Sequence, residues 1–500
     1  MSEIVGRFAR IARDHPARPL VHVPGNRVTW TAENLWDAAR TYRDAFAARG
    51  LGPDHLLLVA SGNRAATLAI WLACRALDVP VMPVDSGTPV AEMRALAERF
   101  GAFAAIVPES MSDLTHLGAP TALDGTVDTA LVMVPLRGVE PNPDVYRGAA
   151  ALKVTSGSTG LPKATFTRES QLVADSTHIV AAMGIRPDDC QIAVLPLSHA
   201  YGLGNLAIPV LLQGTAIVLR DAFVPQQIVA DATTYRARVF PGVPFMFAHF
   251  ANNAALSWPP TLNALMSAGA PLDAATVRAF AQAFGIKVHS FYGTSETGGI
   301  AYDDSNDLDA AGTVGHPLPN VTVTLRAEDG APANGGRVHV ASAGVSSGYA
   351  GRPASPSSNT DDFTAGGFLT GDFGRFDPRA NLVLTGRASS FINVAGRKVQ
   401  PAEVEQVLRT MTGVVDVRVV GAADARRGQQ ILACIVADDP ALTPGAVRGY
   451  CAARLAAYKV PRTIVWLDRI PLTERGKTDR AKLEALVREH LDRTAESGVL

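Results

Sequence analysis

The sequence predicts an α/β protein: a large N-terminal domain of mostly parallel sheets flanked by helices, a small β-rich subdomain, and a separate α+β domain at the C-terminus. Three observations support this prediction. Over the first ~150 residues, apolar runs typical of buried strands alternate with helical patterns. Short alternating strands broken by glycine and proline follow from about Val321 to Tyr349. After Leu384 the pattern changes again, to a mixture of helices and strands in a tail of ~110 residues.

The N-terminal elements follow from periodicity and from end signals. A helix of 3.6-residue period is expected over 32–48, with Thr31 at its start and Gly50 after its end. The apolar run HLLLVA at 55–60 predicts a buried strand. The same alternation predicts a helix over 65–77 and strands over 79–84, 191–195, 216–219 and 287–291.

The tail predicts a domain of its own. We expect the N-terminal domain over 1–385, with its β-rich subdomain at about 315–385, a hinge at 386–390 and the C-terminal domain over 391–500. Within the last of these, helices are expected over 401–411, 443–455 and 479–493, and strands over 414–420 and 431–436.

Composition narrows the possible functions. Hydrophobic residues make up 47% of the 500 residues and charged residues 19%, which supports an ordered interior. The balance of 46 basic and 47 acidic residues argues against a nucleic-acid binder with a basic surface. The longest apolar stretches are too short for a membrane span, and no signal peptide opens the chain. Four cysteines lie too far apart to predict a zinc site or a disulfide framework, so we expect a cytoplasmic protein.

Lysines are rare in this chain, which has seven of them against thirty-nine arginines. Because arginine supplies the ordinary positive charge and the two side chains are not equivalent, each lysine is a candidate for a specific role. The seven are Lys153, Lys163, Lys287, Lys398, Lys459, Lys477 and Lys482.

The segment TSGSTGLPK at 155–163 has the composition of a phosphate-binding loop. Glycines let the backbone approach an anion, while hydroxyls and backbone N–H groups donate to phosphate oxygens. No Gly-Lys-Ser/Thr closes the segment, so it is not a Walker loop. The alternative is a flexible Ser/Gly loop with a solvated Lys163.

Three further segments hold candidate site residues. In YGTSETGG at 292–299, Glu296 could hold Mg²⁺ on phosphate oxygens and Tyr292 could stack on a planar base; a capping turn with a surface glutamate is the alternative. In LTGD, Asp372 suits a sugar diol or, alternatively, an Asx turn. In TERGKT, Lys477 is either a specific cation or a solvated loop lysine.

Two other motifs lack their usual context. The run GLGNLA at 202–207, with Asp221 beyond it, matches a loose dinucleotide fingerprint but has no tight strand–turn–helix setting. The run GVSSG at 344–348 matches a nucleophile elbow, but no helix pattern follows it.

Taken in order, the segments resemble those of a known family. TSGSTGLPK, SAGAPL, YGTSETGG, TGD, GRASSFINVAGRKVQPAEVE and YKVPR with IPLTERGKTDR are similar to the serial motifs of the AMP-forming adenylating superfamily. Its members include acyl- and aryl-CoA synthetases, nonribosomal-peptide adenylation domains and firefly luciferase. The resemblance covers essentially the whole chain. It implies a two-step reaction in which a carboxylate attacks ATP·Mg²⁺ to give acyl-adenylate and pyrophosphate, and a thiol then displaces AMP.

The resemblance implies a role for each matched residue. Lys477 would bridge the acid carboxylate and the α-phosphate, Glu296 would be the Mg²⁺ ligand, and Ser295 would touch the α-phosphate. Asp372, assisted by Arg387, would bind the ribose hydroxyls. The other implied nucleotide contacts are Thr155, Ser156, Gly157, Ser158, Thr159, Gly160 and Lys163 around the phosphates, and Gly269, Ala270, Tyr292, Gly293 and Thr294 around the adenosine.

In this family the C-terminal domain rotates between the two steps. Gly396, Arg397 and Lys398 match the loop that lines the thiol tunnel, and Ser389 stands where a hinge carboxylate is usual. No carrier-protein serine motif follows Lys477. The acceptor thiol is therefore expected from CoA or from the phosphopantetheine of a separate acyl carrier protein.

The acid pocket is expected to be apolar. His199 matches an aromatic position of the family's pocket, and no aspartate lies near 197–199 to pair with an amine. A buried ammonium would then be unpaired, which favours an aliphatic or aromatic acid without an amine. Gly298 and Gly299 would leave room for a longer acid. The expected lining is His199, Tyr201, Leu203, Phe240, Val243, Ala268, Gly298, Gly299 and Ile300.

Two alternatives stay open from the sequence. The adenylate could be used for a product other than a thioester. In a different class, the GLGNLA run could serve a dinucleotide-dependent oxidoreductase.

Overall fold

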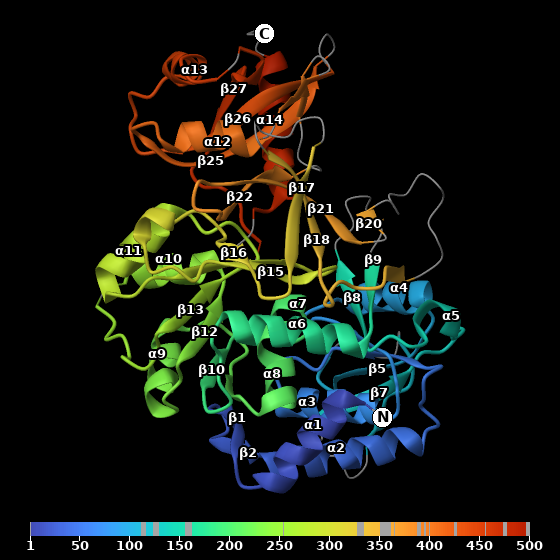
Figure 1. Cartoon of the computed structure of the whole chain (residues 1–500). Helices are drawn as coiled ribbons and strands as arrows, with labels where there is room; N and C mark the ends of the chain where they lie inside the picture. The colour runs from blue at the N-terminus through green and yellow to red at the C-terminus, as the bar shows by residue number, and fades with distance from the viewer. Residues whose placement is uncertain are drawn as a thin grey trace. The chain divides into compact units, whose positions relative to one another are not determined.

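The structure is a computed structural model of the chain (Figure 1). It describes residues 2–111, 117–123, 130–155, 163–253, 255–327, 335–350, 362–364, 366–387, 392–394, 397–399, 401–424, 428–455, 457–473 and 478–496. Among these residues, no helix combines the length and the apolar character that crossing a membrane requires.

The chain divides into two compact units. The first comprises residues 1–323 and 339–369, and the second comprises residues 324–338 and 370–500. Each unit has its own hydrophobic core.

The first unit holds a sheet in which the described strands follow the order β16-β15-β14-β13-β12-β10-β11-β1-β2. From β14 to β1 the neighbours are parallel, whereas β15, β16 and β2 pair antiparallel at the edges. The bounds are β1 Pro19–Val23, β2 Val28–Thr31, β10 Cys190–Ala193, β11 Ala216–Leu219, β12 Val239–Gly242, β13 Ala264–Ser267, β14 His289–Thr294, β15 Gly298–Tyr302 and β16 His316–Pro317.

A second sheet of the first unit has the order β19-β9-β8-β4-β3-β5-β7-β6 among the described strands. Strands β8, β4, β3 and β5 are parallel, and the outer strands pair antiparallel. The bounds are β3 Leu56–Val59, β4 Val81–Pro83, β5 Ala102–Pro108, β6 Thr121–Ala122, β7 Leu131–Pro135, β8 Ala151–Thr155, β9 Lys163–Thr167 and β19 Tyr349–Ala350. The predicted class, mostly parallel sheets with helices on their faces, is confirmed.

Side-chain alternation along the strands separates two layers of core. In β3, Leu57 and Val59 join the cluster that contains residues of both sheets, whereas Leu56 and Leu58 join a second cluster with α4. Helix α3 lies in the shared cluster and is buried from Ala65 to Arg75. A helix that is apolar all round belongs in such a position.

The two helices predicted in the first unit, over 32–48 and 65–77, are present as α2 and α3 with ends within one residue of the prediction. Thr31 caps α2, since its Oγ1 accepts from Asn34 N at 3.2 Å while Asn34 Oδ1 accepts from Thr31 N at 3.0 Å. The bounds are α1 Glu3–Asp14, α2 Ala32–Ala47, α3 Ala65–Ala76, α4 Val90–Phe100, α5 Pro143–Tyr146, α6 Glu169–Ala182, α7 Ala200–Gly202, α8 Ile208–Gln213, α9 Pro225–Thr234, α10 Pro244–Ala251 and α11 Ala274–Phe284.

A smaller sheet corresponds to the predicted β-rich region. Its strands follow the order β17-β18-β21-β20, with β22 paired to β21, and the boundary between the two units passes through this sheet. The bounds are β17 Thr322–Arg326, β18 Gly335–Ala341, β20 Phe363–Thr364, β21 Gly367–Phe376 and β22 Leu382–Arg387.

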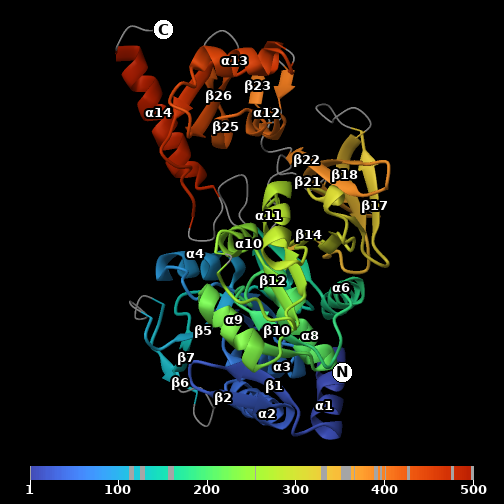
Figure 2. The same cartoon turned by 90° about the vertical axis from the view of Figure 1, so that its left-hand side faces the viewer.

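The rest of the second unit is an α+β domain (Figure 2). Its sheet has the order β24-β23-β26-β25, with β27 paired to β26. Helices α12 and α13 pack in the cluster on one face, while α14 packs with Leu432, Cys434 and Val465 on the other. The bounds are β23 Ile392–Val394, β24 Arg397–Val399, α12 Pro401–Arg409, β25 Val414–Asp424, β26 Gly428–Ala437, α13 Pro444–Ala452, β27 Thr463–Trp466 and α14 Arg480–Glu496.

Candidate active site

The two ends of the predicted phosphate loop lie side by side. Strand β8 ends at Thr155 and β9 begins at Lys163, and these two residues are partners in an antiparallel pair. The Thr155 hydroxyl donates to the Lys163 carbonyl at 3.5 Å. Five of the predicted phosphate contacts, Ser156, Gly157, Ser158, Thr159 and Gly160, lie outside the described residues. The strand pair therefore places the first and last residues of this loop.

Tyr349 connects Lys163 to Glu296. Its hydroxyl donates to Glu296 Oε1 at 3.0 Å, and the Lys163 ammonium lies 5.1 Å from the centre of its ring, within cation–π range. Pairing of Tyr349 with Thr165, from β19 to β9, fixes this position. Burial, together with the negative charge of Glu296, raises the pKa of Tyr349. The hydroxyl is therefore a donor at any physiological pH.

Sequence reasoning did not select Tyr349. Its signal lay in the GVSSG run at 344–348, which directly precedes it. In the structure Ser346 N donates to Glu296 O at 2.8 Å, and Ser346 Oγ bonds to Thr167 Oγ1 at 2.9 Å. The run is thus a turn that supports Glu296, followed by a short strand, and it is not a nucleophile elbow.

Replacing Tyr349 with phenylalanine should weaken ATP·Mg²⁺ use without unfolding the protein. A hydrogen bond to a charged group contributes about 1.5–3 kcal/mol, so we expect the KM for ATP·Mg²⁺ to rise about tenfold in Tyr349→Phe. The matched control is Tyr450→Phe, because Tyr450 is a tyrosine of the α+β domain that donates to Thr410 O at 3.0 Å. Steady-state kinetics with varied ATP checks the difference, and equal KM values for Tyr349→Phe and the parent would contradict it.

The turn that carries Glu296 joins β14 to β15. Thr294 pairs with Gly298 across the hairpin, and the Thr294 hydroxyl accepts from Thr297 N at 3.2 Å. Ser295 and Glu296, both half-buried, form the turn between them. The turn caps no helix, which removes the alternative of a capping turn with a surface glutamate.

The predicted adenosine contacts lie at the carboxyl ends of neighbouring strands. Gly269 and Ala270 follow β13, and Tyr292 and Gly293 lie just before the last residue of β14, the next strand of the same sheet. Gly269 has a φ of +82°, a conformation that favours glycine. The carboxyl edge of parallel strands is the usual place for a ligand site in α/β proteins.

The space over Gly298 and Gly299 is filled. A Cβ on Gly298 would lie 2.1 Å from Asp175 Oδ1, and one on Gly299 would lie 2.9 Å from Leu318 Cδ2. The prediction that these glycines leave room for a longer acid is therefore wrong at these two positions. They are small because a buried aspartate and a core leucine pack against the backbone there.

Asp175 is a buried residue that sequence reasoning missed. It lies on α6, which packs against β15 (Figure 1), and its Oδ1 accepts from Gly299 N at 2.8 Å. Burial raises the pKa of Asp175, an effect that the positive charge of Lys153 opposes. The expectation of a wholly apolar lining is thus incomplete, since this carboxylate contacts the Gly298–Gly299 backbone.

Lys153 is the second unexpected charge. It lies on β8 and is 5% exposed. Its charge interacts with the carboxylates of Asp175 and Glu296. Burial lowers the pKa of Lys153. Among the described residues its ammonium has neither a hydrogen bond nor an ion pair within 4.0 Å. By contrast, Lys287 forms an ordinary buried ion pair with Asp303 at 2.8 Å.

The predicted acid-pocket residues divide into two groups. The first group makes polar contacts: His199 Nε2 lies 3.3 Å from Asp85 Oδ2, and the Tyr201 hydroxyl donates to Met266 O at 3.3 Å. Burial raises the pKa of Tyr201, so the phenol stays neutral. The ring of Phe240 packs instead against Phe247 and Phe250 in the aromatic core. The other members, Leu203, Ala268 and Ile300, are buried, and Val243 is half-buried.

The GLGNLA run is helical throughout. Gly202 ends α7, and Leu203–Ala207 forms a π-helix that continues into α8. A Cβ on Gly202 would lie 2.1 Å from Pro196 O, and one on Gly204 would lie 3.2 Å from Asp175 Oδ2. These glycines permit close helix packing and do not form a phosphate-binding turn.

Asp372 and Arg387 meet in the second unit. They are partners across β21 and β22, and Arg387 Nε donates to Asp372 Oδ1 at 2.6 Å. Asp372 lies within a strand and its own N–H donates to the Thr370 hydroxyl at 3.1 Å. The Asx-turn alternative for Asp372 is therefore wrong, and the two residues implied to bind the ribose lie next to each other.

Several predicted residues are not described. Lys477, Ser389 and Gly396 lie outside the described residues. Arg397 and Lys398 form part of β24, without a description of their side chains. The roles implied for these five residues remain predictions.

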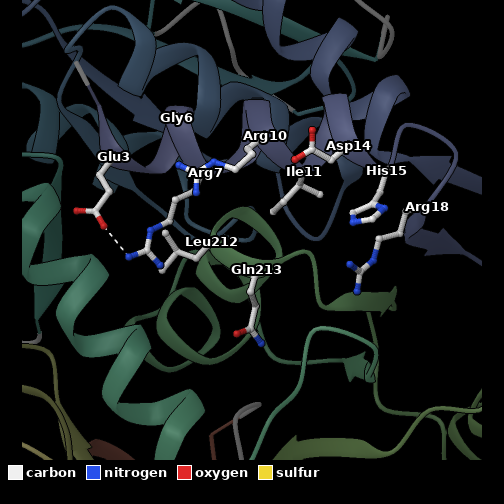
Figure 3. Close-up of a pocket in the computed structure, with 10 residues that line it drawn as sticks. All are labelled: Glu3, Gly6, Arg7, Arg10, Ile11, Asp14, His15, Arg18, Leu212 and Gln213. Carbon is white, nitrogen blue, oxygen red and sulfur yellow. Dashed lines mark ion pairs between the residues drawn. The ribbon is translucent and has the colours of Figure 1, made fainter.

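A cavity of about 640 Å³ elsewhere in the first unit lies along α1 (Figure 3). Leu212 and Gln213 of α8 contribute to its wall, and Arg7 on its rim is paired with Glu3 at 2.7 Å. None of the predicted site residues lines this cavity.

The supported carboxylate of Glu296 and the Asp372–Arg387 pair are both compatible with an adenylate-forming enzyme. Comparison with family models agrees, because the model described as AMP-binding enzyme matches residues 8–350, and that of the AMP-binding enzyme C-terminal domain matches residues 403–477. The chain belongs to the AMP-binding enzyme family. The predicted reaction, activation of a carboxylic acid with ATP and transfer to a thiol, is confirmed. The oxidoreductase alternative does not fit this family.

Individual relatives span almost the whole chain. A sulfoacetate–CoA ligase from Cupriavidus necator is 29% identical, over 94% of this chain and 95% of the relative. A feruloyl-CoA synthase from an Amycolatopsis species is 28% identical, over 94% and 96%. Among solved structures, an amide bond synthetase from Marinactinospora thermotolerans is 26% identical with a TM-score of 0.79, covering 96% of this chain and 99% of that one.

Proposed function

We propose that the protein is a Mg²⁺-dependent acid–CoA ligase that acts on an aliphatic or aromatic acid without an amine. The observation that carries this proposal is the contact of Tyr349 with both Glu296 and Lys163. It brings the turn with the proposed metal ligand to the last residue of the phosphate loop. Because adenylation needs charge neutralisation around transferring phosphates, a carboxylate for the metal and a lysine must stand together.

In the first step, one oxygen of the acid carboxylate forms a bond to the α-phosphorus as the bond to pyrophosphate breaks. Thr155, the 156–160 loop and Lys163 hold the β- and γ-phosphates, and Ser295 contacts the α-phosphate. Lys477 spans the carboxylate and the α-phosphate, where a compact ammonium suits the developing charge. Asp372 and Arg387 hold the ribose.

Mg²⁺ fits the residues present. No group of three or more His, Cys, Asp or Glu able to hold a metal occurs within the described ranges. Mg²⁺ usually uses one or two carboxylates together with substrate phosphates, which suits the half-buried Glu296. When bound there, Mg²⁺ would neutralise charge on the phosphate oxygens. Tyr349 occupies Oε1 of Glu296 and thereby orients the carboxylate.

The second step uses a thiol. We place the thiol tunnel at Gly396, Arg397 and Lys398 and the hinge at Ser389, which would let the 391–500 domain present a different face after adenylation. Relatives that are CoA ligases favour CoA as the acceptor over a carrier protein. Four free, buried cysteines are compatible with a reducing cytoplasm.

The absence of an amine on the acid follows from how Asp175 is bonded. It is the buried carboxylate at the Gly298–Gly299 turn, but it already accepts from Gly299 N and balances Lys153. A substrate ammonium could therefore pair with Asp175 only by disturbing its hydrogen bond with Gly299 N or its interaction with Lys153. The half-buried Tyr201 and buried Leu203 offer apolar surface to the acid instead.

A substrate panel tests the proposal. Pyrophosphate release with ATP and Mg²⁺ is measured for fatty, aryl, dicarboxylic, sulfonic and amino acids, with and without CoA. We expect release with an amine-free acid and acyl-CoA formation when CoA is present. Release only with amino acids would overturn the substrate class. Release without acyl-CoA would overturn the CoA acceptor, and added amines or a carrier protein would then identify the true one, since one structural relative is an amide bond synthetase.

A further inference from the structure

Asp175 sits in a space that three glycines create. Built Cβ atoms would lie 2.1 Å from Asp175 Oδ1 at Gly298, 3.2 Å from its Oδ2 at Gly204, and 3.2 Å from its Cβ at Gly344. Gly298 also has a φ of +71°, which favours glycine. Helix α6, the π-helix, the start of β15 and the turn before Tyr349 therefore all meet at this carboxylate.

The same carboxylate fixes one side of the turn that carries Glu296. Gly299 N donates to Asp175 Oδ1 at 2.8 Å, three residues after Glu296. On the other side, Ser346 N donates to Glu296 O at 2.8 Å and Tyr349 holds Oε1. The position of Glu296 thus depends on three contacts, of which only Asp175 brings a buried charge.

Lys153 gives that charge a counterpart. Lys153 is 5% exposed, and its charge interacts with those of Asp175 and Glu296. A buried ammonium is costly unless a negative charge compensates it. Of the two carboxylates, Asp175 has the larger electrostatic effect on Lys153.

We propose that Asp175 is a positioning residue for the metal site: it anchors the Gly298–Gly299 backbone and balances the buried Lys153, which leaves the Glu296 carboxylate available to Mg²⁺. The inference rests on the proposed function, since it takes Glu296 as the metal ligand. Neither Asp175 nor Lys153 touches metal or nucleotide in this scheme. Both act through Glu296.

The proposal makes the two members of the pair act in opposite directions. In Asp175→Asn the Lys153 ammonium has only Glu296 left, competes with Mg²⁺ and should raise the half-saturating Mg²⁺ concentration about three- to tenfold. In Lys153→Met the competitor is gone, and the concentration should fall below that of the parent. The double variant K153M/D175N should match K153M, because D175N acts on Mg²⁺ only through the Lys153 ammonium.

The measurement is calorimetric binding of α,β-methylene-ATP by the full chain over a series of Mg²⁺ concentrations, which needs no knowledge of the acid. Lys287→Met and Asp303→Asn are the matched controls, because these residues form a buried Lys–Asp ion pair of 2.8 Å outside the site. We expect both controls to lower the melting temperature and to leave the Mg²⁺ dependence unchanged.

Opposite shifts in the two single variants support the proposal. Shifts in the same direction, or lowered melting temperatures alone as in the Lys287 and Asp303 controls, would overturn it. If Asp175→Asn does not fold, Lys153→Met carries the test on its own, because a Mg²⁺ requirement at or above that of the parent would overturn the proposal. Glu296→Gln separates the two levels of inference. If Glu296→Gln leaves the Mg²⁺ dependence unchanged, the proposed role of Glu296 as a metal ligand fails. If Glu296→Gln changes the Mg²⁺ dependence but Asp175→Asn and Lys153→Met do not, only the positioning role of Asp175 fails.

Discussion

Lys477→Ala is expected to abolish adenylate formation while the protein stays folded. Removing one positioned donor to a developing transition-state charge typically reduces kcat by about a hundred- to a thousandfold, and a full positive charge between two anions should count at least as much. Acid-dependent pyrophosphate release should fall by at least about a hundredfold. Thioester formation from a supplied acyl-adenylate should change far less, because Lys477 acts on the first step only.

Lys482→Ala is the matched control for this prediction. Lys482 is another lysine of the α+β domain, its side chain is 73% exposed, and it pairs with Asp479 at 3.5 Å. Exposed ion pairs contribute little, so both activity and melting temperature should match the parent. Pyrophosphate release by Lys477→Ala within a few-fold of that by Lys482→Ala would refute the role assigned to Lys477.

The elements of the fold could be predicted because their signals are local. Thr31 with Asn34 caps α2 at the predicted residue, and the predicted strand at 216–219 is β11. The antiparallel edge strands of both large sheets were not predicted. Strand direction depends on which distant segments pair, and periodicity within one segment carries no information about its partner.

Site residues that lie within a sequence motif could be predicted. Site residues that reach the site from distant parts of the chain could not. Glu296 lies in its own motif, and the structure supplies the contacts that orient it. Tyr349 and Asp175 reach the same turn from β19 and α6, so no spacing along the chain indicates that they contact it. Lys153 had one signal, the rarity of lysine in a chain rich in arginine.

The glycines show why composition alone misled. Glycine at 298 and 299 marks close packing, and the sequence does not say whether a ligand or a protein atom occupies the space. In this fold the occupants are Asp175 and Leu318. Phe240 is a similar case, since an aromatic residue on a buried strand fits either a pocket wall or a core, and here its ring lies in the core.

Asp372→Ala should raise the KM for ATP by about ten- to a hundredfold. Asp372 is 5% exposed and accepts from Arg387 at 2.6 Å, so its carboxylate is held in one orientation, as an acceptor for two ribose hydroxyls must be. Hydrogen bonds to a charged group contribute about 1.5–3 kcal/mol, which corresponds to this range of KM. The kcat at saturating ATP should fall less, because the ribose is remote from the reacting phosphorus.

Asp377 provides the control, because its carboxylate holds a backbone turn, the role that was the alternative for Asp372. Its Oδ1 accepts from the backbone of Arg379 at 2.9 Å and of Asn381 at 2.8 Å, in the turn that follows the same strand. Asp377→Ala should therefore lower stability by about 1 kcal/mol and leave the KM for ATP unchanged. Kinetics with varied ATP, together with thermal unfolding of both variants, measures the two effects separately. If both variants lose stability and neither changes the KM, Asp372 holds only Arg387 and its neighbouring strand, and the ribose must be bound elsewhere.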